Sequence, residues 1–96
     1  MTAPTHSEVL HNTASHRFEF HRGDVVAVLD YAINDRQMAM THTYVPEDFR
    51  GQGIAEKLVR AALAEARTRQ YKVVPECSYV AKFIARHAEF QDLLAE

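Results

Sequence analysis

This chain has few of the residues that form disulfides and tight turns: one cysteine, three glycines and three prolines among 96 residues. The single cysteine, Cys77, excludes an internal disulfide, and a lone thiol fits the reducing cytoplasm. No apolar run approaches the ~18 residues of a membrane-spanning helix. The start of the chain lacks the basic residues and apolar stretch of a secretion signal. We therefore expect a soluble, cytoplasmic protein with a flexible tail over residues 1–7 and no membrane partner.

An excess of positive charge is also absent. Eleven Lys and Arg residues against thirteen Asp and Glu residues give a formal net charge of −2 at pH 7. This is the wrong sign for a protein that binds nucleic acid by neutralising many phosphates, so nucleic acid is not expected as a partner. The hydrophobic fraction of 47% is typical of a globular protein, and a chain of this length suits one domain, which we predict to span residues 1–96.

The first half of the chain has the composition and spacing of β-strands. Phenylalanines alternate with polar residues over 16–21, and the stretches 25–33 and 37–45 are rich in β-branched and aromatic residues. Short polar turns join these segments, which predicts an antiparallel meander. Residues 7–12 fit either an additional edge strand or a loop, and the pattern leaves both open.

The second half changes to helical spacing. Apolar residues over 54–63 recur at intervals of three and four, which predicts an amphipathic helix that starts at or just after Gly53. A short strand over 71–74, stopped by Pro75, follows this helix. A strand–helix–strand sequence of this kind places its two strands side by side and parallel, so this strand should neighbour the one that ends near Val45.

The C-terminal segment has the pattern of two short helices with a break between them, over 79–86 and 89–94, the first capped by Ser78. Its apolar residues are expected in the core or an interface: Val80, Phe83, Ile84, Phe90, Leu93 and Leu94. The predicted fold class is therefore α/β, of the α+β kind: an antiparallel meander, one parallel β-α-β crossover and a helical C-terminus.

Gly51 and Gly53 stand directly before the long helix. A helix start presents unpaired N–H groups and the positive end of the helix dipole, and glycine lets the backbone come close to an anion. Neither a P-loop nor a dinucleotide fingerprint fits, because Glu56 stands where each motif requires glycine. The pattern therefore indicates a site for another phosphate-bearing ligand, with a simple tight turn as the alternative.

The residues of this loop resemble a known family. Residues 50–55, Arg-Gly-Gln-Gly-Ile-Ala, match the (Q/R)-x-x-G-x-(G/A) signature of GNAT-type N-acetyltransferases, and residues 44–49 resemble the lead-in to that motif. With the later stretches VVPECSYVAKF and RHAEF, the chain is similar to a minimal GNAT-like family of small proteins. The likeness runs over most of the chain from about residue 16.

This resemblance implies acetyl-CoA as the cofactor and an amine, not identified by the sequence, as the acetyl acceptor. The loop backbone would wrap the pyrophosphate of coenzyme A, through Arg50, Gly51, Gln52, Gly53, Ile54 and Ala55. The preceding strand would splay from its parallel neighbour and offer backbone groups to the pantetheine arm, through Thr43, Tyr44 and Val45. The chain has no room for the two helices that build the acceptor pocket in larger relatives. A second interpretation is therefore a coenzyme A-binding or protein-interaction module without catalysis.

Three side chains are candidates for chemistry under this resemblance. His42 lies in the strand region where many acetyltransferases carry a base, and a structural, half-buried histidine is the alternative. Cys77 follows the second parallel strand close to a predicted helix start, where its thiol could accept the acetyl group or act as an acid; a buried, inert cysteine is the alternative. Tyr79 could protonate the departing thiolate or be a core aromatic.

Side-chain spacing adds three expectations. Met38, Met40, His42 and Tyr44 should share one face of their strand, because strand side chains alternate. Lys82 and Arg86, one helical turn apart, could meet the phosphates of coenzyme A or face water. The histidines at 11, 16 and 21 recur every five residues, a spacing that fits neither one strand face nor paired helical ligands, so no metal site is predicted.

No pattern requires a partner chain, and we expect a monomer or a weak homodimer.

Overall fold

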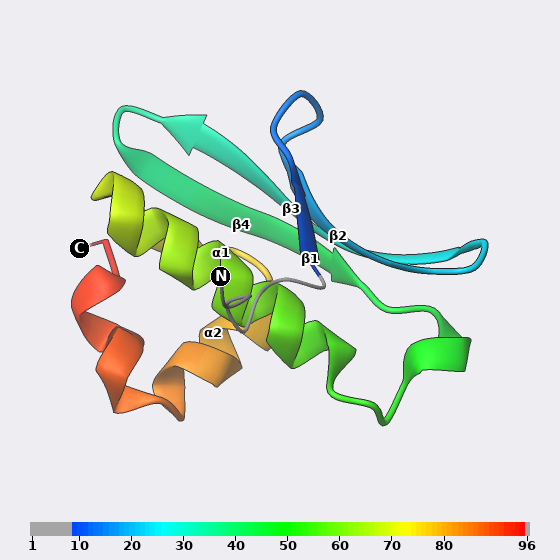
Figure 1. Ribbon diagram of the computed structural model, residues 1–96. Coiled ribbons are helices and arrows are strands. Elements are labelled where there is room, and N and C mark those ends of the chain that lie inside the picture. The colour runs from blue at the N-terminus through cyan, green and yellow to red at the C-terminus, as the bar shows by residue number, and fades with distance from the viewer. Residues whose placement is uncertain (1–8, 96) are drawn as a thin grey trace, which may run out of the picture.

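The computed structural model describes residues 9–95, which form a five-stranded sheet with one long helix lying across it (Figure 1). The strands are β1 (Val9–Asn12), β2 (Arg17–Arg22), β3 (Val25–Asn34), β4 (Gln37–Tyr44) and β5 (Lys72–Pro75). The α-helices are α1 (Ile54–Arg69) and α2 (Ser78–Ala85), and two 3-10 helices are η1 (Glu47–Phe49) and η2 (Ala88–Leu93). The tail predicted for residues 1–7 lies outside the described residues.

The sheet has the strand order β1-β2-β3-β4-β5, so strands that follow one another in sequence are neighbours in space. The pairs from β1 to β4 are antiparallel, which confirms the predicted meander. Strand β5 pairs with β4 in parallel, which confirms the predicted neighbours on either side of the helix. The undecided segment 7–12 is an edge strand from Val9 onward.

The C-terminal segment differs from the prediction at the start of α2. The N-cap residue is Cys77, whose backbone is extended with φ −78° and ψ 130°, and Ser78 is already the first helical residue. The prediction of Ser78 as the cap is therefore wrong by one position, because the cap is set by the point at which the backbone leaves the extended conformation. The helix predicted over 89–94 is present as the 3-10 helix η2.

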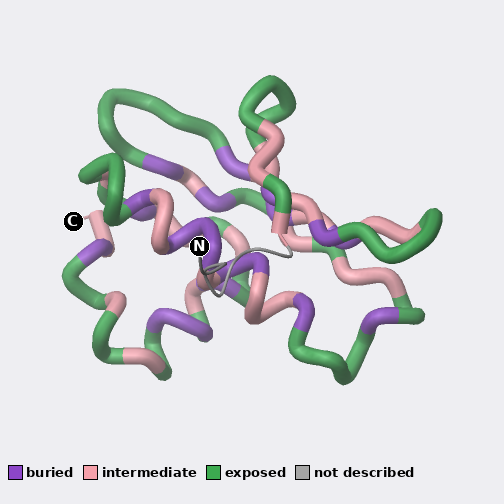
Figure 2. Tube along the Cα trace, in the orientation of Figure 1, coloured by how far each residue is buried: buried purple, intermediate pink, exposed green. Residues whose placement is uncertain are grey.

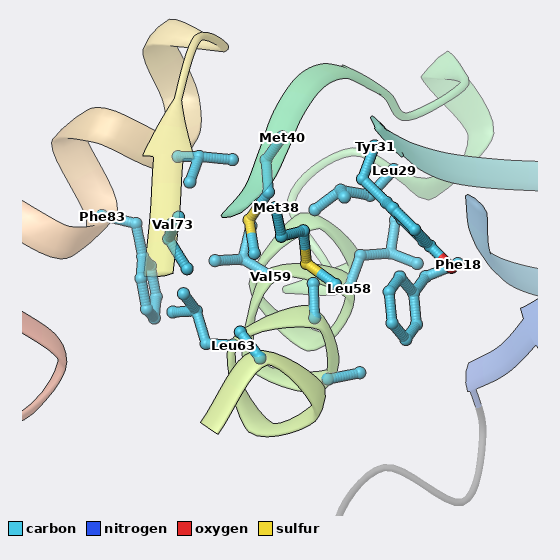
Figure 3. Packing of buried hydrophobic residues seen from close by; sticks show 14 of the residues in the cluster. Phe18, Leu29, Tyr31, Met38, Met40, Leu58, Val59, Leu63, Val73 and Phe83 are labelled. Carbon is cyan, nitrogen blue, oxygen red and sulfur yellow. The ribbon is translucent and has the colours of Figure 1, made fainter. Parts of the chain in front are cut away.

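One face of α1 is buried against the sheet. Its apolar stripe consists of six residues, each at most 2% exposed: Ile54, Leu58, Val59, Ala62, Leu63 and Ala66. In Figure 3 Leu58, Val59 and Leu63 of this stripe point toward the strands, and Phe18, Met38 and Met40 belong to the same buried cluster. Every buried residue in the described part of the chain is hydrophobic. Because removal of apolar surface from water is the main favourable term in folding, this interface fixes how α1 lies over the sheet.

Strand β4 contains a bulge that changes which side chains face the helices. Asp30 pairs with His42 while the next residue, Tyr31, pairs with Met40, so Thr41 is an extra residue in β4. Before the bulge, Met38 and Met40 are buried beneath α1.

Beyond the bulge the alternation is inverted. Thr43 lies opposite the buried Leu29 and shares its face of the sheet, while His42 and Tyr44 are exposed on the other face. The prediction that Met38, Met40, His42 and Tyr44 share one face is therefore wrong, because one added residue moves the following side chains to the opposite side.

Strands β4 and β5 are paired over only part of their length. The parallel pairs run from Gln37 opposite Lys72 to Met40 opposite Pro75, and the last four residues of β4 lie beyond them. Past Pro75 the backbone N–H of Cys77 donates to the carbonyl of Met40 at 2.9 Å. The two strands therefore separate just above Met40, and Thr41–Tyr44 have no β5 partner on that side.

Truncation of the α1 stripe tests the importance of this interface. Leu58 is fully buried, so Leu58→Ala should lower the free energy of unfolding by ~2–5 kcal/mol through lost burial and the cavity left behind. Urea unfolding of the variant and of wild type measures the difference. Thr68→Ala on the exposed side of the same helix should change stability by no more than ~0.5 kcal/mol. A loss below ~1 kcal/mol for Leu58→Ala would contradict the importance assigned to this contact.

Candidate functional site

The loop between β4 and α1 has the backbone conformation that its glycines were predicted to provide. Gly51 has φ +82° and Gly53 has φ +76°, in the left-handed region that side-chain-bearing residues avoid. Gly53 is the N-cap of α1 and supplies no side chain to cap it. The first N–H groups of the helix therefore face the loop without a side-chain acceptor, and the positive end of the helix dipole is directed there.

The space in front of these glycines is open. A Cβ atom added at Gly51 or Gly53 would meet nothing within 4 Å. Glycine is therefore needed for the backbone conformation and not to relieve a contact within the protein. The loop and the turns of the hairpins appear as exposed segments in Figure 2. An anion could thus approach the helix start from solvent.

Two adjoining cavities lie along the start of α1 and one side of α2. The first, of about 260 Å³, is lined by Val45, Phe49, Arg50, Gly51, Gly53, Ile54, Ala55, Glu56 and Tyr79. The second, of about 210 Å³, is lined by Glu56, Tyr79, Lys82, Phe83, Arg86 and His87. Because Glu56 and Tyr79 border both cavities, the two adjoin, and we call them together the α1–α2 groove. It unites the predicted loop residues, except Gln52, with Lys82 and Arg86.

Cys77 lies at the point where β4 and β5 separate. Its side chain is partly buried, and its thiol donates a hydrogen bond to the Thr43 hydroxyl with 3.4 Å between Sγ and Oγ1. Burial alone would raise the pKa of the Cys77 thiol. Once the sulfur is a thiolate, the Thr43 hydroxyl and the backbone N–H groups at the start of α2 donate hydrogen bonds to it, and these bonds outweigh burial and hold the pKa of Cys77 below its usual value. The structure thus places Cys77 at a helix N-terminus, as predicted, with increased thiolate character.

His42 and Cys77 face opposite sides of the sheet. The β4 bulge turns the His42 side chain away from α1, to the face where its cross-strand neighbour is Asp30. No hydrogen bond joins His42 to Cys77 within residues 9–95. The half-buried histidine considered as the alternative is not observed either, since His42 is exposed. His42 is nevertheless adjacent in sequence to Thr43, the residue that contacts Cys77.

Tyr79 is not a core aromatic, because its side chain is 40% exposed and lines both cavities of the α1–α2 groove. Burial, and then the nearby Glu56 carboxylate, raise the pKa of the Tyr79 phenol above its usual value. The phenol therefore keeps its proton at neutral pH and can act as a donor. The backbone groups of Thr43 and Tyr44 lie on the β4 segment that has no β5 partner, next to the groove residue Val45.

Two contributors to the site were not predicted. The Thr43 hydroxyl contacts Cys77, although Thr43 was predicted to act only through its backbone. Its direction depends on the bulge, for which a sequence gives no periodic signal. Glu56 borders both halves of the groove, and it also accepts a hydrogen bond from Arg60 at 2.8 Å, one helical turn away. That i, i+4 spacing is visible in the sequence and signals the ion pair, but not the position beside Tyr79.

Metal and membrane signals are absent from the described part of the chain. No group of three or more His, Cys, Asp or Glu side chains in residues 9–95 is arranged to hold a metal ion. None of the helices in the same range combines the length and hydrophobicity needed to cross a membrane.

Comparison with known proteins agrees with this geometry. The model of the GCN5-related N-acetyltransferase family matches residues 17–93. The chain therefore belongs to the GCN5-related N-acetyltransferases, a family of acyltransferases, as its loop motif predicted. The solution NMR structure of a GCN5-like protein from Staphylococcus aureus matches the fold with a TM-score of 0.74, at 22% sequence identity, over 92% of this chain and 87% of that chain. At this identity the likeness concerns the fold, and it confirms the predicted minimal GNAT-like architecture.

The contact between Thr43 and Cys77 can be tested by titrating the thiol. Thr43→Val removes the hydroxyl that stabilises the thiolate, so the pKa of Cys77 should rise and the pH midpoint of its alkylation by iodoacetamide should move upward. Thr43→Ser keeps the hydroxyl and should keep the wild-type midpoint. An unchanged midpoint in Thr43→Val would show that the hydroxyl does not influence the thiol.

Proposed function

We propose that this protein binds acetyl-CoA in the α1–α2 groove and transfers the acetyl group to an amine. The observation that carries the proposal is the uncapped start of α1 behind two glycines of positive φ, beside the point where β4 and β5 separate. In this arrangement the backbone of Arg50–Ala55 binds the pyrophosphate. The Lys82 and Arg86 side chains, which line the continuing groove, supply positive charge for the phosphates.

The pantetheine arm would occupy the gap between the separating strands. Residues Thr43–Val45 have no β5 partner, so their backbone groups can pair with the amides of the arm as an added strand would. This path leads from the glycine loop toward Cys77 and Thr43 at the closed end of the gap. The thioester would then lie near Thr43, and the preceding residue of β4, His42, faces the opposite side of the sheet.

Direct transfer needs one base and one acid. The amine nitrogen attacks the thioester carbonyl, the C–S bond breaks and a C–N bond forms; the amine proton passes to His42, and the coenzyme A sulfur takes a proton from Tyr79 or Cys77. His42 is exposed on the open face, so in this scheme the amine approaches from that face. In the covalent variant the Cys77 thiolate attacks the thioester, and coenzyme A leaves as a thiolate that takes a proton from Tyr79. The amine then attacks the acetyl-Cys77 thioester, its proton passes to His42, and Cys77 leaves as a thiolate.

A coenzyme A-binding module without catalysis is the second candidate. It is favoured by one observation, the bulge that turns His42 away from Cys77. If no base reaches the amine, the groove would hold the cofactor without supporting transfer. The two candidates share the same binding site and differ only in the chemistry at His42 and Cys77.

Cofactor binding is tested by calorimetric titration with acetyl-CoA. Gly53→Glu places a carboxylate at the start of α1 and strains a residue with φ +76°, so saturable binding should be lost. Gln70→Glu adds the same charge at the opposite end of α1 and should bind acetyl-CoA like wild type. Thermal unfolding of both variants checks that they are folded. Absence of heat and of a thermal shift in wild type at millimolar acetyl-CoA would refute the proposed function.

Catalysis is tested by acceptor-dependent release of the coenzyme A thiol, with a panel of primary amines. In the direct scheme His42→Ala should lower this rate by ~10²–10⁴-fold, the usual contribution of a general base, while calorimetric affinity for acetyl-CoA is retained. Cys77→Ala should lower the rate as well, and intact-mass measurement after mixing with acetyl-CoA shows whether Cys77 carries the acetyl group. Unchanged release in both variants would remove these two roles, and no release from wild type would favour the binding module.

A further inference from the structure

The turn between β2 and β3 reaches the glycine loop through Arg22. Figure 1 shows this turn and η1 at the same end of the sheet. Arg22 is the last residue of β2, and its Nη1 donates a hydrogen bond to Oε1 of Gln52 at 2.9 Å. The two residues are thirty positions apart in the sequence. A segment with no place in the loop motif therefore touches the centre of that motif.

Gln52 is held at both ends of its amide group. Its Oε1 accepts the bond from Arg22, and its Nε2 donates to the backbone carbonyl of Asp48 at 2.9 Å. A guanidinium can only donate and a carbonyl can only accept, so these partners fix the orientation of the amide. The Gln52 side chain thus joins the β2–β3 turn to the segment that precedes the two glycines.

Arg22 is itself held by an aromatic pair. Its guanidinium lies 5.3 Å from the ring centroid of Phe20 and 5.6 Å from that of Phe49. These rings meet edge to face with centroids 5.5 Å apart, and both are only 3% exposed. The cation therefore rests on a rigid platform formed by β2 and η1. Phe49 is the last residue of η1, which precedes the glycine loop. Arg22 therefore contacts the segment from η1 to the glycines at two points, Phe49 and Gln52.

The glycine loop has need of such a support. Gly51 and Gly53 have no side chains, and the space around the position of each Cβ is open, so no side-chain packing at these two positions restrains the loop. Free glycines sample many conformations, and binding an anion through backbone N–H groups requires that they stop doing so. A loop already fixed in the free protein binds more tightly than one that must be ordered by its ligand.

We propose that Arg22 is a positioning residue for cofactor binding, which acts through Gln52 to hold the glycine loop in its binding conformation. This inference rests on the proposed function for its effect on acetyl-CoA, but the effect on the loop exists in the free protein. Arg22 does not need to touch a phosphate. Its Nη1 is engaged with Gln52 and its guanidinium with two rings, so its action is on the loop.

The test combines affinity with backbone exchange. Calorimetry should show that Arg22→Ala and Gln52→Ala each weaken acetyl-CoA binding by about 3- to 10-fold, as expected for one lost hydrogen bond to a charged group in an exposed setting. The double variant should be weaker than either single variant by no more than about 2-fold, because both changes break the same link. Amide exchange over residues 50–55 of the free protein should become faster in all three.

Two controls separate positioning from charge. Arg69→Ala removes another exposed arginine at the far end of α1, where it pairs with Glu65, and should leave affinity and loop exchange as in wild type. Arg22→Lys keeps a cation that can rest on the rings and donate to Gln52, and should restore part of the affinity and the slow exchange.

Three results would overturn the proposal. The first is wild-type affinity in Arg22→Ala. The second is additive loss in the double variant, which would make Arg22 a phosphate ligand that acts independently of Gln52. The third is unchanged loop exchange in the free Arg22→Ala protein. If wild type does not bind acetyl-CoA, the proposed function fails, and the exchange measurement alone then decides whether Arg22 holds the loop.

Discussion

The burial of one face of α1 against the sheet is the contact on which the rest of the structure depends. The stripe from Ile54 to Ala66 removes the helix from water on the side of the strands, and this fixes both its direction and its rotation about its own axis. The start of α1 is thereby held beside the ends of β4 and β5. The glycine loop, the groove and the gap between the strands are consequences of where that one helix begins.

The site divides into two parts that are stabilised differently. The part that would hold phosphate consists of backbone groups and exposed cations, and its shape depends on contacts from outside the loop, such as the bond from Arg22 to Gln52. The part that would hold the thioester is compact, with Cys77 tied to Met40 through its backbone and to Thr43 through its thiol. Substitutions can therefore alter one part of the site without altering the other.

The sequence predicted most of the fold because short-range patterns determine it. The alternation in β2 and β3, the polar turns and the spacing of three and four in α1 place β2, β3, β4 and the start of α1 to within a residue or two, and the crossover rule then gives the parallel pair. The short helix η1 was not predicted, and β1 was left undecided. The loop motif identified the family. What the sequence did not predict depends on single residues without periodic signal: the extra Thr41 in β4, the cap at Cys77 and the contact of Arg22 with Gln52.

The bulge at Thr41 determines which side chain of β4 lies beside the thiol of Cys77. In a regular strand of the same sequence, His42 would follow Met40 on the helix face and Thr43 would point outward, which would set an imidazole in place of a hydroxyl beside the thiol of Cys77. A relative with an unbroken strand one residue shorter would keep the present orientation, whereas an unbroken strand of equal length would exchange the two side chains. The number of residues between the β3–β4 turn and the glycine loop therefore determines which side chain lies beside Cys77, and the identity of those residues alone does not.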